Sequence, residues 1–139
     1  MSDRRGGIRH GRPRLTRSAD FDRVYRKGRS AATRTFVLYA FPSSEREDAG
    51  PPQDRADVRL GVSVGRRVGG AVDRNRVKRL LREAFWALDE ELPDGYDFVI
   101  VARAGSSEAA AQHGLDGVRA ELAALLAQLS LGNAAVREG

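Results

Sequence analysis

The chain has 139 residues, 41% of them hydrophobic, and no cysteine. This composition suits one small globular domain and excludes disulfides, iron–sulfur clusters and thiolate metal sites. It has no apolar stretch near the roughly 18 to 20 residues that cross a bilayer, and its amino terminus lacks the apolar segment of a secretory signal. We therefore expect a soluble, cytoplasmic protein without membrane contact.

The net charge of +5 is divided unevenly along the chain. Residues 1–34 and 59–82 together carry a net charge of +15, whereas residues 35–58 and 83–139 together carry −10. One part of the molecule is thus expected to meet a polyanion while the rest stays away from it.

The first 28 residues predict a basic arm followed by a short helix. Residues 1–14 contain five arginines and three glycines with almost no apolar content, so we expect a flexible arm. Within residues 15–28, Ser18 is expected to cap the helix and Gly28 to end it in a left-handed conformation. The apolar face of this helix would carry Phe21, Val24 and Tyr25.

Two strands are predicted next. Residues 35–41 are β-branched and aromatic and are apolar on both faces. One face carries Phe36, Leu38 and Ala40, and the other carries Val37, Tyr39 and Phe41. Residues 58–65 alternate between an apolar face and a small, polar face. Between these strands, residues 42–57 are rich in Ser, Gly, Asp and Pro and predict a mobile loop.

Residues 74–88 form the most informative pattern of the chain. At about 100° per residue they divide into an apolar face and a cationic face, and Glu83 is their only acidic residue before position 89. An ordinary solvated helix mixes acids and bases, so this density of positive charge favours a partner with closely spaced anions, best a nucleic acid backbone. Gly70 or Asp73 is the expected cap.

The remaining sequence predicts one strand and one helix. Residues 96–102 are apolar enough for a buried strand, and leucines at spacings of three and four predict a helix over residues 115–129. A strand, a helix and a strand in that order suggest two parallel neighbours. The fold class expected is an α+β sandwich, with the sheet on one side and helices packed against it.

No catalytic or metal-binding constellation is visible. The two histidines, His10 and His113, lie in the arm and in an alanine-rich stretch, and the acids of residues 89–94 are interpreted as a solvated surface. The glycines of residues 65–70 lack the spacing of a phosphate-binding P-loop. We therefore predict neither catalytic residues nor a metal site in the protein.

At this point the sequence resembles the protein subunit family of bacterial ribonuclease P. The resemblance rests on RLGVSV at residues 59–64, the basic pair Arg66 and Arg67, and RNRVKRLLREAF at residues 74–85. It covers roughly residues 15–130, which we take as one RNA-binding domain followed by a tail over residues 131–139.

The resemblance implies an αβββαβα fold like the second domain of ribosomal protein S5, with an uncommon left-handed crossover through the cationic helix. It also implies that a catalytic RNA removes the 5′ leader of precursor tRNA with bound Mg²⁺, held mainly by that RNA, while the protein assists. The partners implied are the catalytic RNA and precursor tRNA, and no protein partner is implied.

Two sets of site residues follow from the resemblance. The set expected to contact the catalytic RNA is Arg66, Arg67, Arg74, Asn75, Arg76, Lys78, Arg79 and Arg82. The set expected around a cleft for the single-stranded leader is Phe21, Tyr25, Phe36, Val37 and Tyr39. Aromatic side chains suit unpaired bases, but the same positions, Phe21 and Phe36 above all, also suit a plain core.

Three alternatives stay open. The chain could be a non-catalytic RNA-binding or ribosome-associated protein of the same fold. It could also place the cationic helix in the major groove of DNA, although no preceding helix and tight turn are visible. Trp86 falls on the polar side of the cationic helix, where it either stacks on RNA or covers an edge of the fold.

Overall fold

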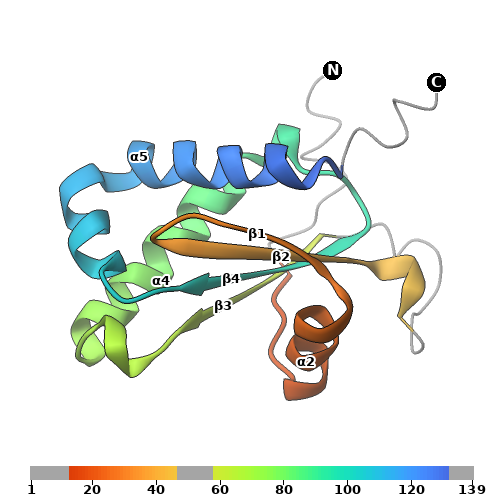
Figure 1. Cartoon of the computed structure of the whole chain (residues 1–139), viewed down its shortest axis with the longest axis horizontal. Helices are drawn as coiled ribbons and strands as arrows, with labels where there is room; N and C mark the ends of the chain where they lie inside the picture. The colour runs from red at the N-terminus through yellow and green to blue at the C-terminus, as the bar shows by residue number, and fades with distance from the viewer. Residues whose placement is uncertain (1–12, 47–57, 132–139) are drawn as a thin grey trace.

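The computed structural model describes residues 13–46 and 58–131, which form one sheet with helices on both of its faces (Figure 1). Within these residues the α-helices are α2 (Ser18–Lys27), α4 (Ala71–Trp86) and α5 (Ser106–Leu129). The strands are β1 (Arg29–Ala32), β2 (Phe36–Pro42), β3 (Arg59–Val64) and β4 (Tyr96–Ala102). This order confirms the expected αβββαβα arrangement.

The predicted arm, loop and tail lie largely outside the described residues. Of the arm only Pro13 and Arg14 are described, and they are not free: the backbone of this segment pairs with β3 through Arg14 and Leu60. The expectation of a flexible arm is therefore wrong for these two residues. The predicted loop is described only up to residue 46, where residues 43–45 form a 3₁₀ turn.

The sheet is mixed, with the strand order β1-β2-β4-β3. The strand β2 pairs antiparallel with both β1 and β4, whereas β3 pairs parallel with β4. The helix α4 connects β3 to β4, which confirms the prediction of two parallel neighbours joined through the cationic helix. The left-handed sense expected for this crossover stays a prediction.

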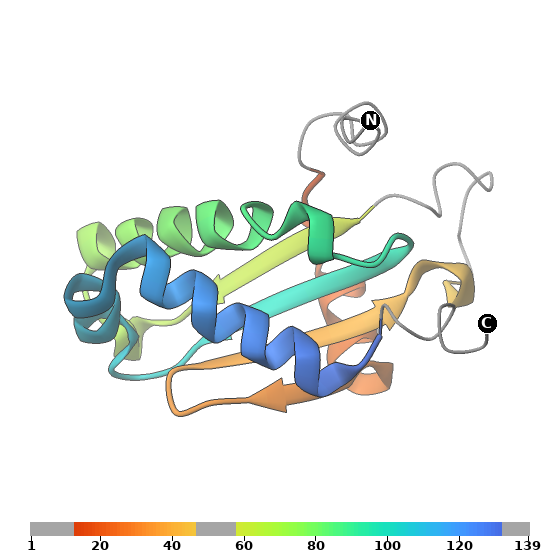
Figure 2. The same ribbon diagram turned by 90° about the horizontal axis from the view of Figure 1, so that it is seen from above.

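The two faces of the sheet carry two separate cores. The helices α4 and α5 lie over one face, and α2 lies against the other (Figures 1 and 2). The larger core includes Leu38, Leu60, Leu81, Phe85, Phe98, Ile100 and Leu122. The smaller core, under α2, is built from Leu15, Val24, Phe41 and Val99. The sheet is thus a middle layer, and not one outer side as expected from the sequence.

Both expected caps of α2 differ from the prediction. Arg17 is the amino-terminal cap and no side chain bonds to the free amides there, while Ser18 is already helical. Gly28 has a φ of −81°, so it is extended and not left-handed. A Cβ on Gly28 would lie 2.5 Å from the Val24 carbonyl oxygen and 2.6 Å from that of Ala40, so close backbone approach, and not a left-handed turn, requires glycine here.

One strand was not located from the sequence, and one helix begins earlier than predicted. The strand β1, with the sequence RSAA, has little β-propensity of its own and forms by pairing with β2. The helix α5 begins at Ser106, not near residue 115, and bends at Gly114, whose φ of 67° falls in the left-handed region. The alanine-rich stretch is therefore helix, and the glycine marks a kink within it.

Candidate nucleic-acid interface

The helix α4 presents its cations outward because its apolar side chains are used for packing. Val77, Leu81 and Ala84 are completely buried against the sheet and α5. Among the predicted RNA contacts, Asn75, Arg76 and Arg79 are exposed, as are Arg66 and Arg67 on the 3₁₀ turn before the helix. The other three, Arg74, Lys78 and Arg82, are half-buried. The whole predicted set therefore lies on the surface around one helix.

Arg76 is held in place from two sides. Its Nη2 donates to the Ser107 hydroxyl at 2.9 Å and lies 3.4 Å from Asp73 Oδ1 in the first turn of α4. Ser107, at the start of α5, is only 6% exposed, whereas the Arg76 side chain is 48% exposed. These contacts fix the guanidinium group while part of it stays open to a ligand. Sequence reasoning did not single out Ser107.

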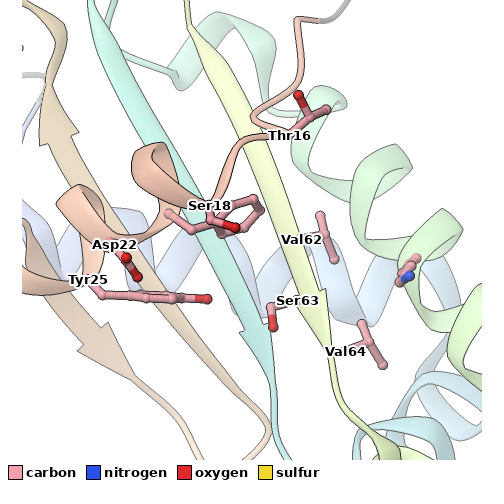
Figure 3. Close-up of a pocket in the computed structure, with 9 residues that line it drawn as sticks. Thr16, Ser18, Asp22, Tyr25, Val62, Ser63 and Val64 are labelled. Atoms are coloured by element: carbon pink, nitrogen blue, oxygen red, sulfur yellow. The ribbon is translucent and has the colours of Figure 1, made fainter.

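A groove lies between α2 and β3, which is an edge strand of the sheet (Figure 3). This α2–β3 groove is open, has a volume of about 440 Å³, and is lined by Thr16, Ser18, Phe21, Asp22, Tyr25, Val62, Ser63, Val64 and Lys78. It combines an aromatic wall from α2, small side chains from β3 and one cation from α4. Lys78 is thus the residue that belongs to both surfaces.

An aromatic cluster forms the α2 wall of the groove. The rings of Tyr25 and Tyr39 meet edge to face with centroids 5.0 Å apart, and those of Phe21 and Tyr25 are 6.2 Å apart. Tyr25 is 36% exposed, and its phenol points across the groove toward Ser63 in Figure 3. Burial raises the pKa of Tyr25, against the opposing effect of a side-chain hydrogen bond with Ser63.

The structure separates the five predicted cleft residues. Phe21 and Tyr25 line the groove, whereas Tyr39 does not line it but packs edge to face against Tyr25. Val37 lies on the same face of β2 as Tyr39, two residues away. Phe36 is 1% exposed and belongs to the larger core under α4 and α5. Its assignment to the cleft is wrong, because successive strand residues point to opposite faces.

Trp86 covers an edge of the fold, which resolves the two alternatives left for it. It is 6% exposed and packs edge to face against Phe85 with ring centroids 5.0 Å apart. The indole therefore has little free surface for stacking on a base.

A buried network of charges holds α2 against the sheet and so shapes the groove. Arg59 on β3 donates two hydrogen bonds to the carboxylate of Asp97 on β4, at 2.9 and 2.8 Å. The same guanidinium lies 3.7 Å from Asp20 of α2, which also accepts from Arg23 at 2.9 Å. Both carboxylates are buried, at 0% and 4% exposure. Sequence reasoning missed this network.

The small residues of β3 make room for the groove. A Cβ on Gly61 would lie 2.6 Å from the Phe21 ring, so only glycine allows this ring to rest on the strand. Ser63, two residues on, lines the groove beside Tyr25. The alternation of residues 58–65 already indicated a small, polar face, and this signal could have identified the groove floor.

Other kinds of site find no support within residues 13–46 and 58–131. There, no group of three histidine, aspartate or glutamate side chains is placed to hold a metal ion, and no helix is long and apolar enough to span a membrane. The element directly before α4 is a three-residue 3₁₀ turn that follows β3, so the described residues contain no helix-turn-helix at α4.

Comparisons with known proteins agree with this arrangement. A profile of the family described as Ribonuclease P matches residues 10–130. The ribonuclease P protein component of Shouchella clausii is 46% identical over 90 residues, which cover 65% of this chain and 66% of the relative. The structure of the Staphylococcus aureus RNase P protein has a TM-score of 0.67 at 30% identity and covers 86% of this chain and 97% of that one.

A second solved structure gives the same result. The RNase P protein from Thermotoga maritima has a TM-score of 0.68 at 30% identity, covering 83% of this chain and 96% of that chain. With a sequence profile that spans most of the chain and two solved structures of the same fold, the chain belongs to the ribonuclease P family, as the protein component of the enzyme that matures the 5′ ends of transfer RNA.

Proposed function

We propose that α4 and the turn before it bind the catalytic RNA of ribonuclease P, and that the α2–β3 groove binds the unpaired 5′ leader of precursor tRNA. The protein would thereby anchor the substrate beside the RNA that cleaves it. The observation that carries this proposal is the separation of a cationic helix face from an aromatic groove, with Lys78 between the two.

The cationic face suits a folded RNA because its charges are numerous and have few acidic partners among the described residues. Of the predicted contacts, only Arg76 forms an ion pair with a described carboxylate. The Nε atom of Arg74 is buried and finds no hydrogen-bond partner within the described residues. Guanidinium groups can donate two parallel hydrogen bonds to a phosphate, and each such contact releases counterions from the RNA.

The groove suits an unpaired strand. Its volume of about 440 Å³ is open at the surface, so a strand can pass along it and is not enclosed. Stacking of a base on an aromatic ring contributes about 1 to 3 kcal/mol with little sequence preference. A leader of varying sequence is the kind of substrate that such a surface accepts.

Magnesium is assigned mainly to the RNA subunit. The described residues bring together no set of three acidic or histidine ligands, so they do not fit a dedicated protein site for this ion, which prefers several oxygen ligands. The contribution of this chain would be to bind and orient the two RNAs. The cytoplasmic location expected from the sequence stays a prediction.

Reconstitution with the cognate catalytic RNA tests the proposal. At low magnesium the protein should raise the rate of leader removal from precursor tRNA, and an Arg74→Ala, Arg76→Ala double variant should lose this effect. A protein that binds structured RNA but does not change leader removal would instead be the ribosome-associated alternative, and preference for duplex DNA would support the DNA-binding one.

Leader-length dependence tests the groove independently of α4. Substrate affinity of the reconstituted enzyme should rise as the first leader nucleotides are added, and Tyr25→Ala should remove most of that gain. A Leu115→Ala variant is the control, because Leu115 is 40% exposed on α5, on the other side of the sheet. An equal gain in the Tyr25 variant and the wild type would contradict the assignment.

A further inference from the structure

A second cavity lies between α4 and Arg14, whose backbone pairs with β3. It has a volume of about 300 Å³ and is lined by Arg14, Leu60, Arg79, Arg82, Glu83 and Trp86. None of these residues lines the α2–β3 groove. We call it the three-arginine pocket, after Arg14, Arg79 and Arg82.

Backbone pairing places Arg14 at this pocket. The Leu60 amide donates to the Pro13 carbonyl oxygen at 3.0 Å, and the Leu15 amide donates to the Leu60 carbonyl oxygen at 2.9 Å. The Leu15 side chain is 4% exposed and lies in the smaller core, on the α2 side of the sheet. Because adjacent side chains of an extended segment point in opposite directions, Arg14 is turned toward α4.

The charges around the pocket are not balanced within the described part of the chain. Arg79 and Arg82 lie one turn apart on α4, and neither they nor Arg14 form an ion pair with a described carboxylate. Glu83 also lines the pocket, so three positive charges meet one negative charge. Burial, and then repulsion from Arg14, lower the pKa of Arg82, which indicates that this cluster gains from an added anion.

We propose that the three-arginine pocket is a phosphate-binding site for the catalytic RNA, in which Arg14 supplies a third guanidinium beside the two from α4. This inference rests on the proposed function and extends it to a residue outside the helix. Leu60 and Trp86 supply the apolar part of the lining, and Arg82 is half-buried beside them. Guanidinium groups match a phosphate through paired hydrogen bonds.

The salt dependence of RNA binding tests the pocket. Affinity of the full-length chain for the catalytic RNA is measured from about 0.05 to about 0.3 M salt, for the wild type and for Arg14→Gln. Log affinity falls with log salt, and loss of one phosphate contact should make this negative slope less steep by about 0.7 to 0.9 and weaken binding about tenfold. Arg14→Lys keeps the charge and should keep the slope, while losing part of the affinity.

The matched control is Arg119→Gln. Arg119 is an exposed arginine of α5 whose nearest carboxylate, that of Asp116, lies 3.4 Å away on the same helix. The pairing of Arg14 with β3 uses backbone atoms, so the fold should persist in the Gln variant, and circular dichroism checks this. The double variant Arg14→Gln, Arg82→Gln should lose less affinity than the two single variants added together, since both arginines bind one ligand.

Three outcomes overturn the inference. The first is a salt dependence of RNA affinity that is as steep in Arg14→Gln as in Arg119→Gln. The second is full additivity of the Arg14 and Arg82 variants. The third combines two results for Arg14→Gln: its RNA affinity is unchanged, but it loses binding of a polyglutamate peptide. This combination would make the pocket a carboxylate site. If the wild type itself does not stimulate leader removal, the proposed function fails. If the wild type stimulates normally but Arg14→Gln binds the catalytic RNA as the wild type does, only the assignment of the pocket fails.

Discussion

Replacing Arg59 by methionine should destabilise the domain through the two carboxylates it leaves behind. The substitution keeps most of the apolar stem and removes only the charge and the donors. Asp97 would lose two hydrogen bonds of 2.9 and 2.8 Å while remaining completely buried, and its next cation, Arg46, lies 3.9 Å away. Breaking a buried ion pair by removing one partner costs about 3 to 5 kcal/mol.

We expect a value at the low end of that range. The Arg59 side chain is 22% exposed, so water reaches part of the space it vacates, and Asp20 keeps its contact with Arg23. A loss of about 3 kcal/mol is a large fraction of the roughly 5 to 15 kcal/mol by which such domains are stable. Urea denaturation followed by circular dichroism measures it, as a lower midpoint at unchanged slope.

Two further variants show whether charge burial is the cause. Arg119→Met removes the exposed contact with Asp116, where the side chains are 46% and 90% exposed, and should cost less than about 1 kcal/mol. The double variant Arg59→Met, Asp97→Leu leaves no unpaired carboxylate on β4 and should recover part of the loss. If Arg59→Met costs no more than Arg119→Met, the network does not hold α2 in place.

Three other predictions follow from single contacts. Gly28→Ala should lower the free energy of unfolding, measured by urea titration, by about 1 to 3 kcal/mol or more, because its Cβ would lie within 2.6 Å of two carbonyl oxygens. Gly65→Ala is the control and should be nearly neutral, because a Cβ there would have nothing within 4 Å. Ser107→Ala should weaken binding of the catalytic RNA without changing stability by more than about 1 kcal/mol, and it should have no effect once Arg76 is replaced, which a double-mutant cycle measures. The folded-state pKa of Tyr25 lies above its ordinary value of 10.0, so its contribution to stability is complete below about pH 10 and is lost as the pH rises through the folded pKa. Stability measured from pH 9 upward should therefore fall less steeply in Tyr25→Phe, and an equal slope in both proteins would contradict the shift.

Periodicity was a reliable guide where one face of an element is buried. The run of residues 74–85 could be divided into apolar and cationic faces because helix geometry fixes which side chains share a face, and the structure buries Val77 and Leu81 while leaving Arg79 exposed. The same pattern left Trp86 undecided, because its position on the helix is polar. In the structure its indole is 6% exposed, belongs to the larger core and packs against Phe85, which a helical projection does not show.

Contacts between residues far apart in the chain were beyond sequence reasoning. Arg59 and Asp97 are 38 residues apart, and only the parallel register of β3 with β4 brings them together. The strand β1 depends in the same way on its neighbour. For Phe36 the information was present, since alternation separates it from Tyr39, but an assignment carried over from a family outweighed it.

The strand β3 contributes to both surfaces to which the proposed function assigns an RNA. Its residues alternate: Leu60 belongs to the core under α4, while on the other face Gly61 lies under the Phe21 ring and Ser63 lines the α2–β3 groove. Val64, at the end of the strand, borders both the core and the groove. The strand thus fixes the position of the cationic helix through one set of side chains, and leaves space for an aromatic wall through the other. In the proposed function, the spacing of the two RNAs therefore follows from the packing of α4 and α2 on one sheet and not from a flexible connection.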